Sequence, residues 1–291
     1  MVSTQTQRGV ASRADARPGF RGLFPNVLLR WRRPVWWQEL GIIAIGYWLY
    51  SLGRNAIPEQ ASIATRHGLS IQHIQDILHL NFEKSVNSWV AAHEWIAQCL
   101  DYYYATLHFV VTIGVLLWLF IKRPHVYRGA RTVLFTTTLI ALAGFALYPT
   151  APPRLLSGEG YIDTVIKFHT WGSLAQPEIA SHSNQYAAMP SLHIGWAMWA
   201  GISLFMCARS RWWRAFGLAY PFFTLVVIVG TANHYIIDAI GGAIVVALAF
   251  GVQWLFSGHG AYTPPFDAPD FGLPDPPLPS LRPSRLVGSA K

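Results

Sequence analysis

A histidine and an aspartate stand four residues apart near the end of the apolar part of the sequence, at His234 and Asp238. Residues four apart share one face of a helix, so Asp238 is placed to accept a hydrogen bond from one ring nitrogen of His234. Such a bond fixes the tautomer and leaves the other nitrogen basic, as a nucleophile or a general base requires. A carboxylate in the membrane is costly unless it is paired, which favours a functional pair. The alternative is a structural pair that holds two helices together.

A second histidine, His193, follows Pro190 and Ser191 at the start of another apolar run. Proline and serine are typical of a helix start, where free backbone amides and the positive end of the helix favour an anion. Arg154 lies in a proline-rich stretch, and a guanidinium suits bidentate binding of a phosphate. Taken singly, His193 also fits a ring that only bonds a backbone carbonyl, and Arg154 fits a residue that contacts solvent or lipid headgroups.

Three stretches together resemble a known family. They are Tyr148-Pro149-Thr150-Ala151-Pro152-Pro153-Arg154, the Pro-Ser-x-His sequence Pro190-Ser191-Leu192-His193, and His234-x-x-x-Asp238 followed by Gly241 and Gly242. In this combination the chain resembles the type 2 phosphatidic acid phosphatase (PAP2) superfamily, and within it the inositol phosphorylceramide synthase-like branch. The resemblance extends over about residues 91–256.

The resemblance implies a division of labour among these residues. His234 would attack phosphorus to form a phosphohistidine intermediate, and Asp238 would orient it. His193 would protonate the leaving oxygen, while Arg154 and the region of Ser191 would hold the phosphoryl oxygens. We expect three more residues to contribute to substrate binding: Asn233, Tyr235 and Lys167.

Two positions depart from the pattern of the superfamily. No lysine precedes Arg154 in its stretch, and Val227 and Ile228 stand where Ser-Arg is usual ahead of the third motif's histidine. Other cationic groups must therefore neutralise the phosphate. The candidates are Lys167, His169 and His182.

The elements that position these residues are predicted to be membrane-spanning helices. The chain has 291 residues, of which 52% are hydrophobic and only 12% charged, whereas soluble domains carry about 25% charged residues. A helical span needs about 20 mostly apolar residues. The sequence predicts an all-α polytopic membrane protein with six spans and a PAP2-like helical bundle. The expected spans are 36–52, 102–121, 132–148, 191–207, 213–229 and 235–256.

The distribution of basic residues predicts the orientation. With six spans, 17 of the 22 lysines and arginines fall on one side and 5 on the other. Cytoplasmic flanks retain such residues, so both termini are predicted to be cytoplasmic in a cell-membrane protein, and the candidate site faces the extracytoplasmic side. The net charge of +8 is explained by this topology and indicates no nucleic-acid partner, because the basic residues lie between apolar runs.

Outside the spans the sequence predicts three further segments. Residues 1–35 form a basic cytoplasmic tail, and residues 258–291, rich in proline and glycine, a disordered one. Residues 55–100 carry apolar residues at helical spacing, which indicates amphipathic helices at the outer interface or a loop packed on the bundle. The catalytic membrane domain is 36–257. Cys99 and Cys207 lie in or beside apolar runs, so neither a disulfide nor a cysteine-bound metal is expected.

The function expected from these features is phosphoryl chemistry on a lipid phosphate or phospholipid among the membrane lipids. With water as the acceptor the protein would be a phosphatase, and with a polyol or sugar acceptor a phosphotransferase. No cofactor and no metal is expected. Two alternatives stay open: a lipid or small-solute transporter that uses the His/Asp pair as a proton relay, and a zinc site built from His193, His234 and Asp238.

Overall fold

The computed structural model describes residues 33–56, 61–80, 82–170 and 185–264. Within these ranges the chain forms helices and no strand, and a parallel β-bridge joins Thr150 to Ala187. The predicted all-α class is therefore confirmed for the described residues. The helices are α1 (Trp36–Ala56), α2 (Ala61–Ile77), α3 (Glu83–Ala91), α4 (Glu94–Tyr102), α5 (His108–Lys122), α6 (Pro124–Leu147), α7 (Thr164–Phe168), α9 (Leu192–Cys207), α10 (Arg211–Gly230) and α11 (Ile236–Ser257).

Among the described residues, four helical segments are long and apolar enough to cross a membrane. They are the continuous run Glu94–Lys122, which joins α4 to α5, and the helices α6, α10 and α11. The fourth predicted span is the shorter apolar helix α9, and α1 stands at the position of the first. The chain is thus a multi-pass membrane protein with a helix at every predicted position. Six crossings and the side on which the termini lie stay predictions.

Two helices extend further than hydropathy predicted. α4 continues into α5 through a π-helical turn, Tyr103–Leu107, so the second apolar helix begins before residue 102. α6 begins at Pro124 rather than near residue 132, because proline at the first helical position has a backbone already suited to the helix. Its charged residues do not end it, since Arg131 forms an ion pair with Glu39 of α1.

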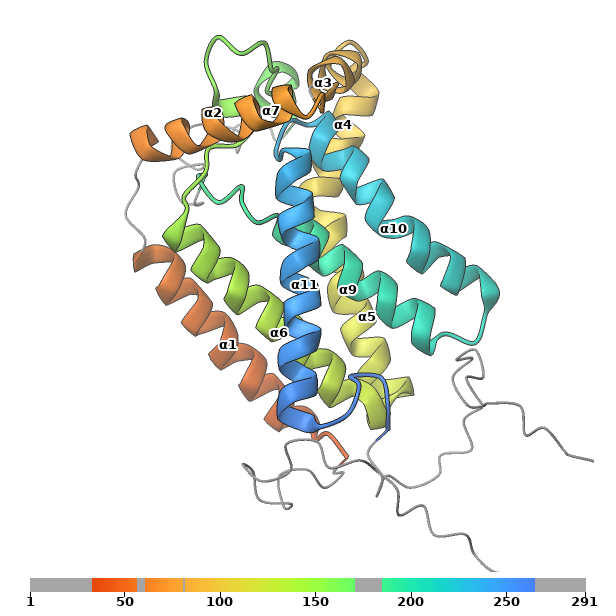
Figure 1. Ribbon diagram of the computed structural model, residues 1–291. Helices are drawn as coiled ribbons and strands as arrows, with labels where there is room; N and C mark the ends of the chain where they lie inside the picture. The colour runs from red at the N-terminus through yellow and green to blue at the C-terminus, as the bar shows by residue number, and fades with distance from the viewer. Residues whose placement is uncertain (1–32, 57–60, 81, 171–184, 265–291) are drawn as a thin grey trace, which may run out of the picture.

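α9 is the central helix of the bundle, and it contacts α5, α6, α10 and α11 (Figure 1). Its Trp199 is fully buried and donates from Nε1 to the carbonyl of Ala130 in α6, at 2.8 Å. α9 and α10 approach closely at Gly201 and Gly217, where an added Cβ would lie 2.3 and 2.6 Å from the other helix's carbonyl oxygen. Small residues allow such close backbone contact between membrane helices. The helix that carries His193 is therefore held from several sides.

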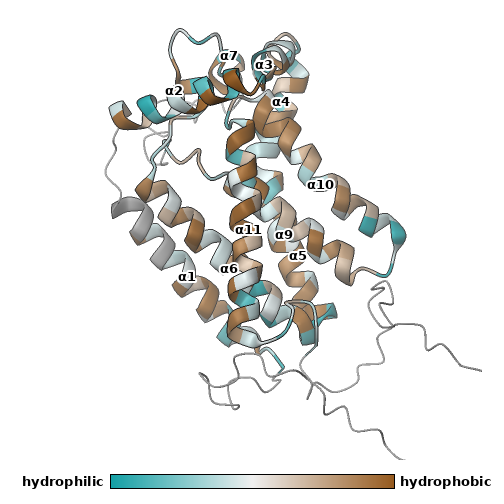
Figure 2. Ribbon diagram, in the orientation of Figure 1, coloured by the Kyte–Doolittle hydropathy of each residue, from teal (hydrophilic) through white to brown (hydrophobic). Residues whose placement is uncertain are grey.

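The described part of the predicted outer segment, residues 61–80 and 82–100, covers one end of the bundle. Figure 1 shows α2 lying across this end, with α3, α4 and α7 beside it, while Figure 2 shows apolar residues along the long helices below. Four polar residues of the segment are buried: Gln72, Gln75, Glu83 and Asn87. Asn87, for example, donates to the carbonyl of Gly230 at 2.9 Å and accepts from the amide of Ile162 at 2.8 Å. The segment therefore packs on the bundle through specific hydrogen bonds.

The first residues of the predicted C-terminal tail also pack on the bundle. Ala261 is buried, and the hydroxyls of Tyr262 and Ser203 lie 2.8 Å apart. Residues 258–264 thus belong to the folded part of the chain. Residues 1–32 of the predicted N-terminal tail and residues 265–291 of the C-terminal one lie outside the described residues.

Candidate active site

His234 lies in the short connection between α10 and α11. The amides of Asn233 and His234 both donate to the carbonyl of Ile228, at 2.9 and 3.2 Å. Ala232, just before them, has a left-handed backbone with φ +52°, which costs a non-glycine residue about 1–2 kcal/mol. Strained residues of this kind are concentrated at functional sites. The connection thus folds back tightly and gives His234 a fixed position.

The ring of His234 is 4% exposed and is oriented by two acceptors. Its Nδ1 lies 2.8 Å from the carbonyl oxygen of Ala188, which can only accept, so Nδ1 carries the proton. Oδ2 of Asp238 lies 3.4 Å from the same nitrogen. The four-residue spacing therefore correctly predicted that Asp238 lies beside the ring. It did not predict the closer acceptor, the carbonyl of Ala188. The other nitrogen, Nε2, is buried and has no hydrogen-bond partner among the described residues, so its lone pair is available.

Asp238 joins the first turn of α11 to the start of α9. Its Oδ2 accepts from the amide of Tyr235 at 3.0 Å, and its backbone carbonyl accepts from the amide of Ser191 at 2.9 Å. Gly242, one turn further along α11, touches the same place, since a Cβ there would lie 2.3 Å from the carbonyl oxygen of Ser191. The glycine after the His-x-x-x-Asp sequence thus lets the two histidine-bearing segments approach each other.

His193 stands in the first turn of α9, with its ring centroid 5.6 Å from that of His234. Tyr104 stacks on the His193 ring at 4.0 Å and accepts weakly from its Nε2 through the backbone carbonyl, at 3.3 Å. His108 lies on another side, 4.4 Å away. Tyr104 belongs to the π-helical turn, a distortion often found at functional sites. We call the end of the bundle that contains His193 and His234 the histidine end.

Arg154 is held beside the His234 connection. It lies in a short 3₁₀ turn after two prolines, and its amide donates to the carbonyl of Ala232 at 3.0 Å. Its guanidinium donates from Nε to Oδ1 of Asn233 and from Nη1 to Oδ2 of Asp163, both at 2.9 Å. Nη2 has no partner among the residues described. The structure therefore brings together Arg154, Asn233, His234 and, through the two rings, His193.

The remaining predicted site residues have structural contacts of their own. The Ser191 hydroxyl caps α9 by accepting from the amide of Ile194, at 3.4 Å. Tyr235 is fully buried, and its hydroxyl donates to the carbonyl of Ala151 at 3.3 Å. Lys167 donates to the carbonyl of Ala91 at 2.6 Å, and His169 is an exposed residue at the end of α7. His182, the third candidate cation, lies outside the described residues.

The family follows from a comparison with known protein families. The family model of the PAP2 superfamily matches residues 69–252. This stretch contains every candidate residue named above, from Arg154 to Asp238, and more than half of the chain. The chain belongs to the PAP2 superfamily. No curated protein and no solved structure matches the chain in the corresponding comparisons. Membership of the PAP2 superfamily supports a membrane lipid phosphatase-type function with a phosphate-bearing lipid as substrate. It does not distinguish the inositol phosphorylceramide synthase-like branch.

Two residues that the sequence did not single out as site residues hold this PAP2 site in place. Glu83 of α3 accepts from the amide of Ile236 at 2.5 Å, and Gln75 of α2 accepts from the amide of Ile237 at 3.1 Å. Nε2 of Gln75 also donates a hydrogen bond to Oε2 of Glu83, at 3.0 Å. The two side chains thereby satisfy free amides at the start of α11, immediately after His234. Burial raises the pKa of Glu83 to about 7. Neither residue belongs to a motif or shares a local segment with α11, so no sequence pattern pointed to them.

The zinc alternative does not match the arrangement of the donors. In the described part of the chain, no group of three His, Cys, Asp or Glu side chains is arranged to hold a metal ion. A zinc site from His193, His234 and Asp238 requires these side chains to converge on one point. Nδ1 of His234 is instead engaged by Ala188, and Nε2 of His193 faces the carbonyl of Tyr104.

Proposed function

We propose that this PAP2 superfamily member transfers a phosphoryl or substituted phosphoryl group from a lipid phosphate or phospholipid through a phosphohistidine on His234. One observation carries the proposal. The buried His234 ring is fixed by Ala188 and Asp238 in the tautomer that leaves the Nε2 lone pair free, beside Arg154 and a second histidine. A nucleophilic histidine requires that tautomer, and a phosphoryl group requires cationic charge next to it.

The proposed reaction has two steps. First, the lone pair of Nε2 attacks phosphorus, a nitrogen–phosphorus bond forms, and the bond from phosphorus to the leaving oxygen breaks. His193, in its imidazolium form, donates a proton to that oxygen and becomes the neutral imidazole. In the second step His193 takes a proton from an incoming water or alcohol, whose oxygen attacks phosphorus and releases His234. Arg154 holds the phosphoryl oxygens through its unpartnered Nη2. The side-chain oxygen Oδ1 of Asn233 accepts from Nε and keeps the guanidinium in place.

The acceptor distinguishes the two reactions that this intermediate supports. Water gives a lipid phosphate phosphatase, whereas an alcohol such as inositol or a sugar gives a phosphotransferase. The proline-rich stretch before Arg154, which resembles the synthase-like branch, favours transfer. The excess of lysine and arginine on the opposite loops favours a site that faces the extracytoplasmic side of the cell membrane.

The test is a product analysis with purified protein. The detergent-solubilised protein is incubated with a panel of lipid phosphates and phospholipids, with and without inositol, and both free phosphate and new lipids are measured. Free phosphate indicates a phosphatase, and a phospholipid formed only with the alcohol indicates a transferase. A phosphoryl label on the protein that is stable to alkali and lost in acid would identify the phosphohistidine.

The matched variants are His234→Ala, at the histidine end, and His259→Ala, which removes a half-buried histidine beyond α11. We expect His234→Ala to lose at least about 10³-fold of the activity and all of the label, because the nucleophile is gone. His259→Ala should retain both. Turnover by a folded His234→Ala protein would refute the mechanism. No product from any substrate, with lipid movement instead, would favour the transporter alternative.

A further inference from the structure

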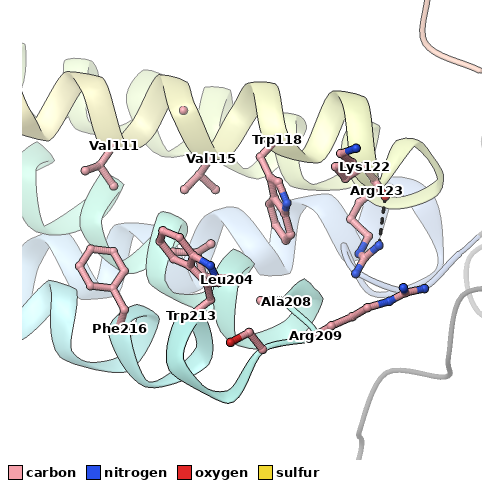
Figure 3. Close-up of a pocket in the computed structure, with 12 residues that line it drawn as sticks. Val111, Val115, Trp118, Lys122, Arg123, Leu204, Ala208, Arg209, Trp213 and Phe216 are labelled. Carbon is pink, nitrogen blue, oxygen red and sulfur yellow. Dashed lines mark hydrogen bonds between the residues drawn. The ribbon is translucent and has the colours of Figure 1, made fainter.

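A groove of about 870 Å³ lies between α5 and α10 on the half of these helices away from the histidines, and the last turns of α9 also line it. On α5 it extends from Val111, one turn after His108, to Arg123. Figure 3 shows Trp118, Trp213 and Phe216 turned toward the space between the helices. Its size is that of a pocket for a small organic ligand, which is commonly about 300–1,000 Å³.

Most of the groove is apolar and open. Gly114 lines it, and an added Cβ there would meet nothing within 4 Å. The hydroxyl of Ser210, a polar lining residue, already accepts from the amide of Trp212 at 3.3 Å. The long apolar part therefore suits hydrocarbon, and it contains no free nucleophile for chemistry.

One end of the groove is basic. Lys122, Arg123 and Arg209 line this end, and Figure 3 shows the two arginines there. None of the three forms an ion pair with a carboxylate among the described residues. Arg123 is held in place by a hydrogen bond from Nε to the carbonyl of Cys207, at 2.9 Å, and lies over the ring of Trp118. Burial and the positive charge of Arg209 lower the pKa of Arg123, as expected for cations without a counter-ion.

We propose that this groove binds one anionic phospholipid from the leaflet opposite the histidine end. The acyl chains lie along Trp118 and Phe216, and the phosphate lies between Arg123 and Arg209. Basic pockets between membrane helices bind anionic headgroups in this way. The polarity of the groove matches that of a phospholipid. The apolar walls along most of its length suit acyl chains, and the cations at one end suit an anionic headgroup. A peptide or nucleotide would need polar partners along the walls.

The inference goes beyond the proposed function and does not depend on it, because the groove is separate from the candidate active site. Its test is lipid retention by the full chain. Protein purified in the uncharged detergent dodecyl maltoside is mixed with dioleoylphosphatidylglycerol or with dioleoylphosphatidylcholine. Native mass spectrometry counts the bound lipids, and intrinsic fluorescence follows thermal unfolding. We expect one phosphatidylglycerol to bind saturably and raise the unfolding midpoint, and phosphatidylcholine to bind no more than the surrounding detergent does.

Two pairs of variants locate the binding. Arg209→Gln should weaken retention about fivefold and Lys122→Gln/Arg209→Gln about thirtyfold, at about 1 kcal/mol per cation. Arg128→Gln, an exposed arginine that does not line the groove, should leave retention unchanged. Gly114→Leu should block the groove and abolish saturable binding. Gly251→Leu is its control, since Gly251 also has nothing within 4 Å of an added Cβ but lies on α11.

Three results would overturn the proposal. The first is equal retention of both lipids, which would mean that the cations select nothing. The second is full retention by Gly114→Leu or by the double variant. The third is no saturable phosphatidylglycerol binding by the wild-type chain, as expected if a second copy or another segment of this chain fills the groove. In that case Gly114→Leu would change the oligomeric mass or the stability without any lipid.

Discussion

The two ends of the bundle hold their charged groups in different ways. At the histidine end, His234, Asp238 and Arg154 are buried or half-buried, and each is bonded to groups from distant parts of the chain. At the groove end, Lys122 and Arg209 are exposed, and no carboxylate among the described residues pairs with them. Chemistry needs groups held within a fraction of an ångström, whereas a mobile lipid headgroup needs only nearby charge. This difference is expected if the proposed reaction requires fixed groups at the histidine end and the proposed lipid requires only positive charge at the groove end.

After the loss of His234, the proposed nucleophile, the largest effect is expected from Arg154→Lys. Lysine keeps the charge but cannot donate to Asn233 and Asp163 from one planar fork. If positioning matters at the histidine end, activity should fall about 10²-fold, the usual loss for one misplaced oxyanion donor. The measurement is kcat/KM for the lipid substrate found in the product analysis.

Arg66→Lys is the matched control, because Arg66 is an exposed arginine of α2 at the same end of the bundle. It should keep wild-type activity. If Arg154→Lys is as active as this control, charge alone suffices at the histidine end, and the two ends would not differ in the way described.

The next effect concerns Glu83 and depends on pH. Burial raises the pKa of Glu83 from 4.5 to about 7. The folded protein therefore holds this proton more tightly than the unfolded chain, so the free energy of unfolding should fall as pH rises from about 4.5 to about 7, by up to about 3 kcal/mol. Glu83→Gln keeps an oxygen for the amide of Ile236 but cannot ionise. Its unfolding midpoint should lose this part of the pH dependence.

The control for Glu83→Gln is Glu94→Gln, an exposed carboxylate at the start of α4. Thermal unfolding of the three proteins between pH 5 and pH 8 gives the comparison. A wild-type midpoint that follows the same pH profile as that of Glu83→Gln would show that Glu83 is ionised without penalty. Buried groups at the histidine end would then not be held more tightly than exposed ones.

The sequence predicted the positions of the helices, and the closeness of Asp238 to His234, better than the contacts that hold them. A helix of the described chain stands at each of the six positions that hydropathy predicted, because an apolar run is a local property. The His-x-x-x-Asp spacing put Asp238 beside His234 for the same reason. Ala188, Gln75 and Glu83 were not predicted, because they reach the α10–α11 connection from segments that come close only in the folded chain. Likewise, the π-helical turn that places Tyr104 on His193 has no local signature.

A smaller effect comes from comparing two glycines, one at each end. A Cβ on Gly242 would lie 2.3 Å from the carbonyl oxygen of Ser191, whereas on Gly114 it would meet nothing within 4 Å. Gly242→Ala should therefore lower the free energy of unfolding by about 1–3 kcal/mol, because helix backbones must separate. Gly114→Ala should raise it by up to about 1 kcal/mol through helix propensity. Thermal unfolding of both variants tests the pair. If Gly242→Ala and Gly114→Ala unfold at the same midpoint, the histidine end is no more tightly packed than the groove.

The smallest effect expected is that of Tyr235→Phe, which tests whether the residue after His234 contacts the substrate or only holds the fold. The buried Tyr235 hydroxyl donates to Ala151 at 3.3 Å, so its loss should cost about 0.5–1.5 kcal/mol of stability. Activity should stay near the wild-type value, because the bond points the hydroxyl at a backbone carbonyl rather than at a substrate. A tenfold lower kcat/KM with an unchanged unfolding midpoint would restore Tyr235 to the substrate site. The hydroxyl would then have to leave the carbonyl of Ala151 when the lipid binds, so the frame around His234 would rearrange during the reaction.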